Sequence, residues 1–122
     1  MKEECLYTVR EATSLVSDSM HYKTIYDWIL KVERYTPKVF LRAIDKEHPR
    51  FVYGEPKAQL LINPKEIEQF QKLLMLRKQG VPLQLAIFQV FLRPEDYRFL
   101  QDNEWDYQEL KAKVIRDYKN KA

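Results

Sequence analysis

Residues 7–32 read YTVREATSLVSDSMHYKTIYDWILKV, and this stretch decides the predicted fold. Thr8 and Glu11 have the spacing of a capping box, which predicts a helix that begins immediately after Thr8. The apolar residues behind this cap recur with the period of an α-helix and are Val9, Ala12, Leu15 and Val16. The Ser-Asp-Ser run at 17–19 interrupts that period, so it ends the first helix and supplies the expected N-cap of a second one.

The second predicted helix covers about residues 20–34 and is strongly amphipathic. Its apolar side chains follow the spacing i, i+3, i+4, i+7 and are Ile25, Trp28, Ile29 and Val32. A helix turns by about 100° per residue. The opposite face and its flanks therefore hold a different set, which is Lys23, Asp27, Leu30, Arg34, Tyr26 and Lys31. Two short helices joined by a polar turn are typical of a helix-turn-helix, whose second helix lies in the major groove of duplex DNA.

The predicted DNA-binding residues come from this second helix and from the loop that follows it. They are Tyr22, Lys23, Tyr26, Asp27, Lys31, Arg34, Lys46 and Arg50. Base edges are read mainly by the N-terminal turns of a recognition helix, so Lys31 and Arg34 are expected to reach phosphates. Two alternatives stay open. An ion pair with Asp27 would explain Lys23 as ordinary helix surface, and packing would explain the two tyrosines.

Residues 38–62 lose the helical period and become strand-like. The runs rich in strand-forming residues are KVFLRAI, RFVYG and AQLLI, and the polar DKEHP separates the first two. Such runs around a charged loop that contains proline predict a β-hairpin near residues 38–54. A hairpin directly after a recognition helix is a wing, which is expected to lie along the DNA backbone.

The charge distribution agrees with that placement. From Lys31 to Arg50 there are six basic and three acidic residues, which gives this window a charge of +3. The remaining residues hold 15 basic and 15 acidic side chains, so the chain's net charge of +3 lies entirely in the window. A local basic excess favours a polyanionic partner.

The chain from residue 63 onward is expected to be helical. The NPKE run at 63–66 supplies an N-cap, a proline at the first helical position and a glutamate at the third, and Gly80 suits a left-handed cap at the helix end. The next helix, LQLAIFQVFL, is apolar on nearly all sides, so it must be buried or lie in an interface. A short helix follows, and the last helix is expected to bear Trp105, Leu110, Val114 and Tyr118.

The predicted fold is therefore mainly α with a small antiparallel β-sheet, a winged helix-turn-helix in one compact domain over residues 1–122. Residues 6–62 would form the winged half and residues 63–122 a second helical half. The helices expected over 64–79 and 82–92 form another helix-turn-helix-like pair. An arrangement of two related halves around a central sheet is thus a second interpretation of the same pattern.

The order YTVREA, TIYDWI, a hairpin and INPKEIEQFQKLLMLRKQGVPLQLAI resembles the winged-helix DNA-binding domain of the mercury-resistance-type (MerR) regulators. It is also similar to the small excisionases of phages and conjugative transposons. The similarity covers about residues 6–92 and is most specific at 24–28 and 76–83. It implies that the helix near 20–34 enters the major groove and that the hairpin touches the DNA backbone. The chain departs from MerR-type regulators because it continues into short helices and not into a long dimerisation helix with an effector-binding region.

This departure from the MerR-type regulators reduces the number of functions that we expect for the chain. The size, the overall resemblance and the lack of a sensor region point to an accessory DNA-binding protein of a Gram-positive conjugative plasmid, which would bind near a transfer origin. The expected partners are double-stranded DNA and a relaxase or other transfer or recombination proteins. The alternatives are a MerR-like or excisionase-like transcription regulator, a recombination directionality factor, and a protein-interaction subunit that uses the same scaffold without DNA.

Composition argues against several other classes of protein. With 45% hydrophobic residues the chain is not disordered. Gly54 and Gly80 are its only glycines, which excludes a glycine-rich phosphate loop. His21, His48 and Cys5 lack the spacing of a nucleophile pair or a zinc site. We therefore expect no enzyme activity, metal, cofactor or small-molecule effector. A single cysteine, no signal peptide and no membrane-spanning apolar run lead us to expect a cytoplasmic protein.

Overall fold

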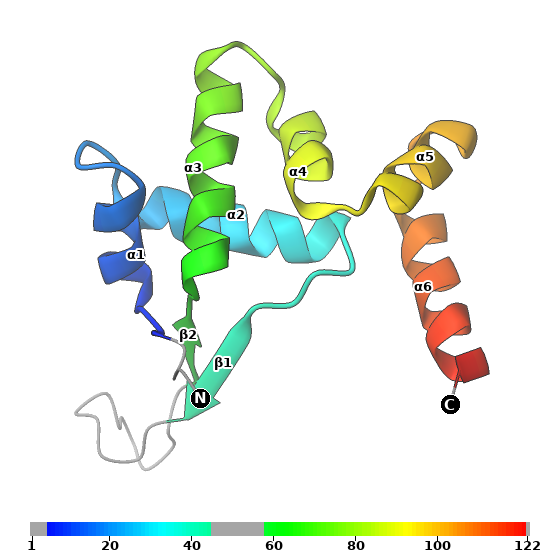
Figure 1. Cartoon of the computed structure of the whole chain (residues 1–122), viewed down its shortest axis with the longest axis horizontal. Helices are drawn as coiled ribbons and strands as arrows, with labels where there is room; N and C mark the ends of the chain where they lie inside the picture. Colours follow the sequence, from blue (N-terminus) through cyan, green and yellow to red (C-terminus); the bar gives the residue numbers. More distant parts are fainter. Residues whose placement is uncertain (1–4, 45–57, 122) are drawn as a thin grey trace.

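The computed structural model describes residues 5–44 and 58–121, and this part of the chain forms six helices and a two-stranded antiparallel sheet (Figure 1). In chain order the elements are α1 (Val9–Val16), α2 (Tyr22–Tyr35), β1 (Leu41–Ile44), β2 (Ala58–Leu61), α3 (Pro64–Lys78), α4 (Leu83–Phe91), α5 (Pro94–Asp102) and α6 (Tyr107–Lys121). The predicted class, mainly α with a small antiparallel sheet, is confirmed.

The first helix begins as predicted, but the second does not. The Thr8 hydroxyl accepts a hydrogen bond from the Glu11 N–H at 3.2 Å, and the Glu11 carboxylate accepts one from the Thr8 N–H at 2.9 Å. The predicted N-cap of the second helix at 17–19 is wrong. The two serine hydroxyls of that turn lie 3.1 Å apart and hydrogen-bond to each other. His21 caps α2 instead, because its Nδ1 accepts the Lys23 N–H at 3.2 Å.

The sheet pairs β1 with β2, with Leu41 opposite Leu61. Tyr7 and Ile62 extend the pairing by exchanging two backbone hydrogen bonds of 2.8 Å. The first strand of the predicted hairpin lies where it was expected, and its described partner is the AQLL segment of β2. The RFVYG run, which was expected to form the returning strand, lies outside the described residues.

The larger of two hydrophobic clusters in the described residues joins α1, α2, α3, α4 and the sheet, and the smaller one contains Phe88, Leu100 and Leu110. Ile25, Ile29 and Val32 are fully buried and Trp28 is 6% exposed, so the predicted apolar stripe of α2 is confirmed. The Trp28 ring stacks on Phe70 of α3 with centroids 6.4 Å apart. In Figure 1, α3 passes in front of α2, so the two helices cross. The core draws its residues from both sides of residue 63.

The connection from α3 to α4 contains the predicted left-handed glycine. Gly80 has a φ of 91°, and the following Val81 N–H donates to the Leu76 carbonyl at 3.0 Å, the hydrogen bond of a Schellman motif. The apolar helix α4 then buries Ala86 and Phe88. Over residues 5–44 and 58–121, no helix combines the length and the apolar character needed to cross a bilayer.

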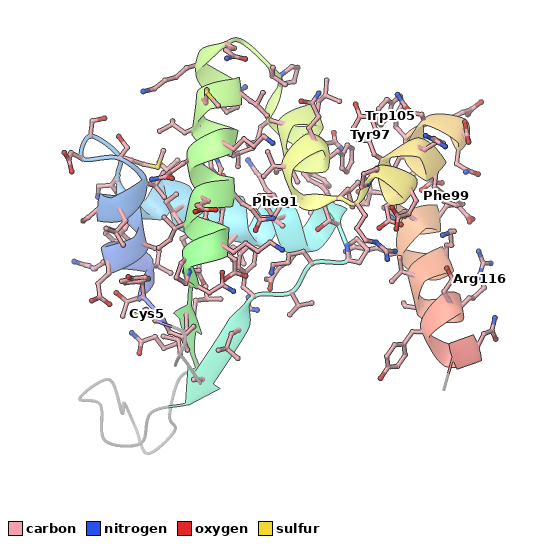
Figure 2. The ribbon with its side chains drawn as sticks, in the orientation of Figure 1. Cys5, Phe91, Tyr97, Phe99, Trp105 and Arg116 are labelled. Atoms are coloured by element: carbon pink, nitrogen blue, oxygen red, sulfur yellow. The ribbon has the colours of Figure 1, made fainter. Side chains whose placement is uncertain are left out.

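The turn between α5 and α6 differs from the sequence-based expectation, because Trp105 is not part of the last helix. Asp106 caps α6 by accepting the Gln108 N–H at 3.0 Å, so that helix starts two residues after Trp105. Glu104 and Trp105 both have positive φ, 56° and 63°. Trp105 is held in this turn by stacking on Phe88, at 6.1 Å, and it lies beside Tyr97 (Figure 2).

Contacts of Glu33 attach α6 and β1 to the last turns of α2. The Lys111 ammonium of α6 donates to the Glu33 carbonyl at 2.7 Å, and burial lowers the pKa of this lysine. The Glu33 carboxylate pairs with both terminal nitrogens of Arg42, at 2.6 and 2.7 Å, and also accepts the Phe40 N–H at 3.0 Å. Glu33 therefore fixes both α6 and the first strand of the hairpin relative to α2.

The packing of Trp28 predicts a large loss of stability on truncation. Trp28→Ala should lower the free energy of unfolding by about 3–5 kcal/mol, because a buried aromatic is replaced by a cavity. Chemical denaturation followed by circular dichroism measures this change. Tyr118→Ala is the matched control, since Tyr118 is 77% exposed and a surface truncation changes stability by about 0.5 kcal/mol or less. Equal effects of the two variants would contradict the observed burial.

The Glu33–Arg42 pair predicts a pH-dependent contribution to stability. Hydrogen bonding from Arg42 holds the pKa of Glu33 below its usual value, so the stabilisation is present above the pKa of an ordinary glutamate and is lost as pH falls through the lower, folded value. Glu33→Gln should cost about 1 kcal/mol at neutral pH. The difference from wild type should begin to shrink as pH falls below the ordinary glutamate pKa of about 4.3, and it should vanish only below the lower pKa of the folded state.

Denaturant unfolding at a series of pH values tests this expectation. Asp27→Asn is the control, because Asp27 pairs with Lys31 on an exposed part of the same helix. Its effect should stay within about 0.5 kcal/mol at every pH. A difference between wild type and Glu33→Gln that does not depend on pH would show that the ion pair adds no net stability.

Candidate nucleic-acid interface

The solvent-exposed side of α2 is the candidate interface. We define the α2 face as the residues that lie opposite its buried stripe, Lys23, Tyr26, Asp27, Leu30, Lys31 and Arg34. Tyr26 and Leu30 are 48% and 45% exposed, large fractions for side chains of this kind. Lys23 and Arg34 are also exposed. The structure thus orients α2 as the sequence predicted, with its apolar stripe inward and its cations outward.

The charges of the α2 face are only partly paired. Asp27 lies 3.0 Å from Lys31, at the i, i+4 spacing, so the alternative in which Asp27 pairs with Lys23 is wrong. Within the described residues Lys23 and Arg34 take part in no ion pair. The face has three cations and one anion, a net charge of +2. Its unpaired cations lie near the two ends of the helix, and the neutralised pair lies between them.

Tyr22 lies at the start of α2, where it contacts α1 as well as its own helix. The Arg10 guanidinium lies over the Tyr22 ring, 4.3 Å from its centroid. His21 stacks on the same tyrosine at 4.6 Å. Tyr22 is half-buried by these contacts. Its ring therefore packs within the protein, which was the open alternative to its predicted role in DNA binding. Sequence reasoning missed Arg10, because nothing in the spacing of the chain shows which residue of α1 reaches the start of α2.

The basic residues that follow α2 are largely paired within the protein. Lys38 lies 2.7 Å from Glu66, a carboxylate whose side chain is 5% exposed. Arg42 pairs with Glu33. The predicted contacts Lys46 and Arg50 lie outside the described residues. The basic excess that the sequence shows after α2 therefore overstates the charge that the described part of this segment can offer to a ligand.

The dimensions of α2 suit a groove of duplex DNA. Its 14 residues span about 21 Å, and a helix with its side chains is about 10–12 Å wide, close to the width of the major groove. Lysine and arginine donate to phosphates or to guanine, and an exposed apolar residue such as Leu30 can contact a thymine methyl group. The connection from α1 to α2 covers Ser17 to His21, five residues, against three or four in the usual helix-turn-helix.

The described residues outside α2 contain grooves but no metal-binding cluster. Among residues 5–44 and 58–121 no three His, Cys, Asp or Glu side chains gather as ligands. A groove of about 410 Å³ separates the end of α4 from α6. Phe91, labelled in Figure 2, lines it together with Pro37, Lys38, Leu92, Arg93, Asp96, Val114, Asp117 and Tyr118. A second groove, of about 310 Å³, lies between α4 and α5.

Comparisons of the chain with models of protein families, with curated proteins and with solved structures find no match. They identify no family, relative or structural neighbour whose function could be transferred to this protein. The functional interpretation of the α2 face therefore rests on the exposure, charge and packing of its own residues.

Proposed function

We propose that this protein binds double-stranded DNA through the α2 face and recognises a specific sequence. The observation that carries the proposal is the orientation of α2. Ile25 and Ile29 on its inner side are completely buried, and Lys23 and Arg34 on the opposite side are exposed without an ion pair in the described residues. A helix that is anchored along one side can present the other to a groove.

The rigidity of α2 supports the proposal. The helix is held at its centre by the stacking of Trp28 on Phe70. Its last turn is held by Glu33, which contacts Arg42 through its carboxylate and Lys111 through its carbonyl. Side chains on a helix that is fixed at several points need little ordering when they bind, which favours affinity.

The chemistry of the face divides into two roles. Lysine and arginine neutralise phosphates and release counterions, which supplies affinity that depends strongly on salt. Lys23 and Tyr26 lie in the N-terminal half of α2, where a recognition helix reads base edges. Arg34 lies in the last turn and is placed to reach a phosphate. The proposed sequence specificity therefore comes from the first half of the helix.

The narrower role that we propose comes from the resemblance of the sequence to small DNA-processing factors. In this role the protein is an accessory factor of plasmid conjugative transfer that binds near a transfer origin, with a relaxase as a protein partner. A transcription regulator or an excision factor would use the same face. Footprinting on the DNA of the replicon that encodes the protein separates these roles, since a protected site lies at a transfer origin, a promoter or a recombination site.

A protein-interaction role is the second candidate, and Trp105 favours it. Its side chain is 40% exposed although it stacks on Phe88, and the groove between α4 and α5 includes Phe88 and Tyr97. Exposed aromatic residues beside a groove are typical of protein docking sites. Failure to bind any duplex DNA at low salt, together with retained folding, would favour this candidate over DNA binding.

The DNA-binding proposal predicts the effect of removing the two unpaired cations of the α2 face. Lys23→Ala combined with Arg34→Ala should weaken binding to the footprinted site by about 1–3 kcal/mol and reduce the salt dependence. Fluorescence anisotropy with labelled duplex DNA at several salt concentrations measures both quantities. Unchanged affinity and an unchanged salt slope would show that α2 is not part of the DNA interface.

The matched control removes two exposed lysines from α3. Lys65 and Lys72 lie on the outer side of that helix. Because α2 and α3 turn their buried stripes toward each other, their outer sides point in opposite directions. Lys65→Ala combined with Lys72→Ala removes the same charge and should leave the affinity within about twofold of wild type. An equal loss in both double variants would show that only the total charge matters.

A further inference from the structure

Arg10 is an exposed cation of α1 that lies against the start of α2. Its guanidinium carbon is 4.3 Å from the centre of the Tyr22 ring, within the range of a cation–π interaction. The nearest acidic residue in the sequence, Glu11, uses its carboxylate to cap α1 at Thr8. Within the described residues Arg10 has no ion-pair partner, so its charge is available to a ligand.

The Tyr22 ring is held in place from its own helix. His21 stacks on it at 4.6 Å, with an interplanar angle of 30°. The same histidine accepts the Lys23 N–H through Nδ1, so it is itself fixed at the start of α2. The ring therefore forms a firm surface on which the guanidinium of Arg10 rests, and Tyr22 directly precedes Lys23 of the α2 face.

A guanidinium that lies over an aromatic ring keeps its donors. When a guanidinium stacks on a ring, its flat face makes the contact and the N–H bonds around its edge can still donate to phosphate oxygens. Adding Arg10 to the α2 face raises its net charge from +2 to +3. The cation of α1 thus lies against the first residue of the helix that carries the α2 face.

We propose that Arg10 is a DNA phosphate contact and that Tyr22 is a positioning residue that acts through it. This inference rests on the proposed function, and it assigns α1 a direct part in binding the nucleic acid. It also changes the role that the sequence analysis gave to Tyr22. The aromatic ring of Tyr22 contributes to binding because it supports the guanidinium of Arg10. The phenol hydroxyl of Tyr22 does not contribute to binding.

Variants of the full chain separate these roles. Arg10→Gln removes the cation, Tyr22→Leu removes the ring, and Tyr22→Phe removes only the hydroxyl. Each is titrated by fluorescence anisotropy against labelled mixed-sequence duplex DNA and against the footprinted site, over a range of KCl concentrations. Thermal melting of every variant shows whether it is folded. Arg98→Gln is the charge-matched control, since this exposed arginine lies on α5, far from α1 in Figure 1.

Arg10→Gln and Tyr22→Leu should each weaken binding about five- to tenfold at 0.1 M salt and lower the salt slope by about one. The losses should be equal on the two DNAs, because a phosphate contact carries no sequence information. Tyr22→Phe should bind like wild type. The double variant Arg10→Gln, Tyr22→Leu should be no weaker than Arg10→Gln alone, because both changes remove one contact.

Several results would overturn the inference. They are wild-type affinity for Arg10→Gln, a loss for Tyr22→Phe as large as that for Tyr22→Leu, and an equal loss for Arg98→Gln. If wild type binds DNA and one of these results is found, the inference about Arg10 and Tyr22 is wrong and the proposed function stands. If wild type binds neither duplex at low salt, the proposed function fails as well. Arg10→Gln changes an exposed residue, so it decides the outcome even if Tyr22→Leu unfolds.

Discussion

The stacking of Trp28 on Phe70 sets the orientation of α2, and the other features of the candidate interface depend on it. A helix has a fixed angular period, so the choice of residues that face the core also decides which residues face the solvent. Once Trp28 and its apolar neighbours are buried, Lys23 and Arg34 must point outward. Glu33 then fixes the remaining freedom, since it links the end of α2 to β1 and to α6.

The sequence correctly predicted the parts of the fold that are determined by residues close to one another along the chain. The capping box at Thr8, the same arrangement at Asn63, and the apolar stripe around Trp28 each follow from residues a few positions apart. The cap at His21 and the turn at Trp105 were missed because several polar residues precede each helix and any of them is a possible N-cap, whereas the structure uses His21 and Asp106. Which competitor wins depends on the surroundings, as Trp105 depends on Phe88 of another helix.

Charge was the least reliable guide to the site. The sequence shows a basic excess after α2, but Lys38 and Arg42 are paired with Glu66 and Glu33, and neither partner is close in sequence to its cation. Arg10, which no pattern in the sequence singles out, lies beside the start of α2. Counting charges along a chain cannot separate cations that stabilise the fold from those that remain free, because pairing is a tertiary property.

The two left-handed residues between α5 and α6 make the direction of the last helix depend on more than its neighbours in sequence. Glu104 and Trp105 occupy a backbone region that costs an ordinary residue about 1–2 kcal/mol, and neither is a glycine. Contacts inside the α5–α6 segment offset part of this cost, because Trp105 packs on Tyr97 and donates its backbone N–H to the Leu100 carbonyl. Phe88 of α4 adds a stacking contact from outside the segment. The direction in which α6 leaves α5 is therefore set by the corner together with α4.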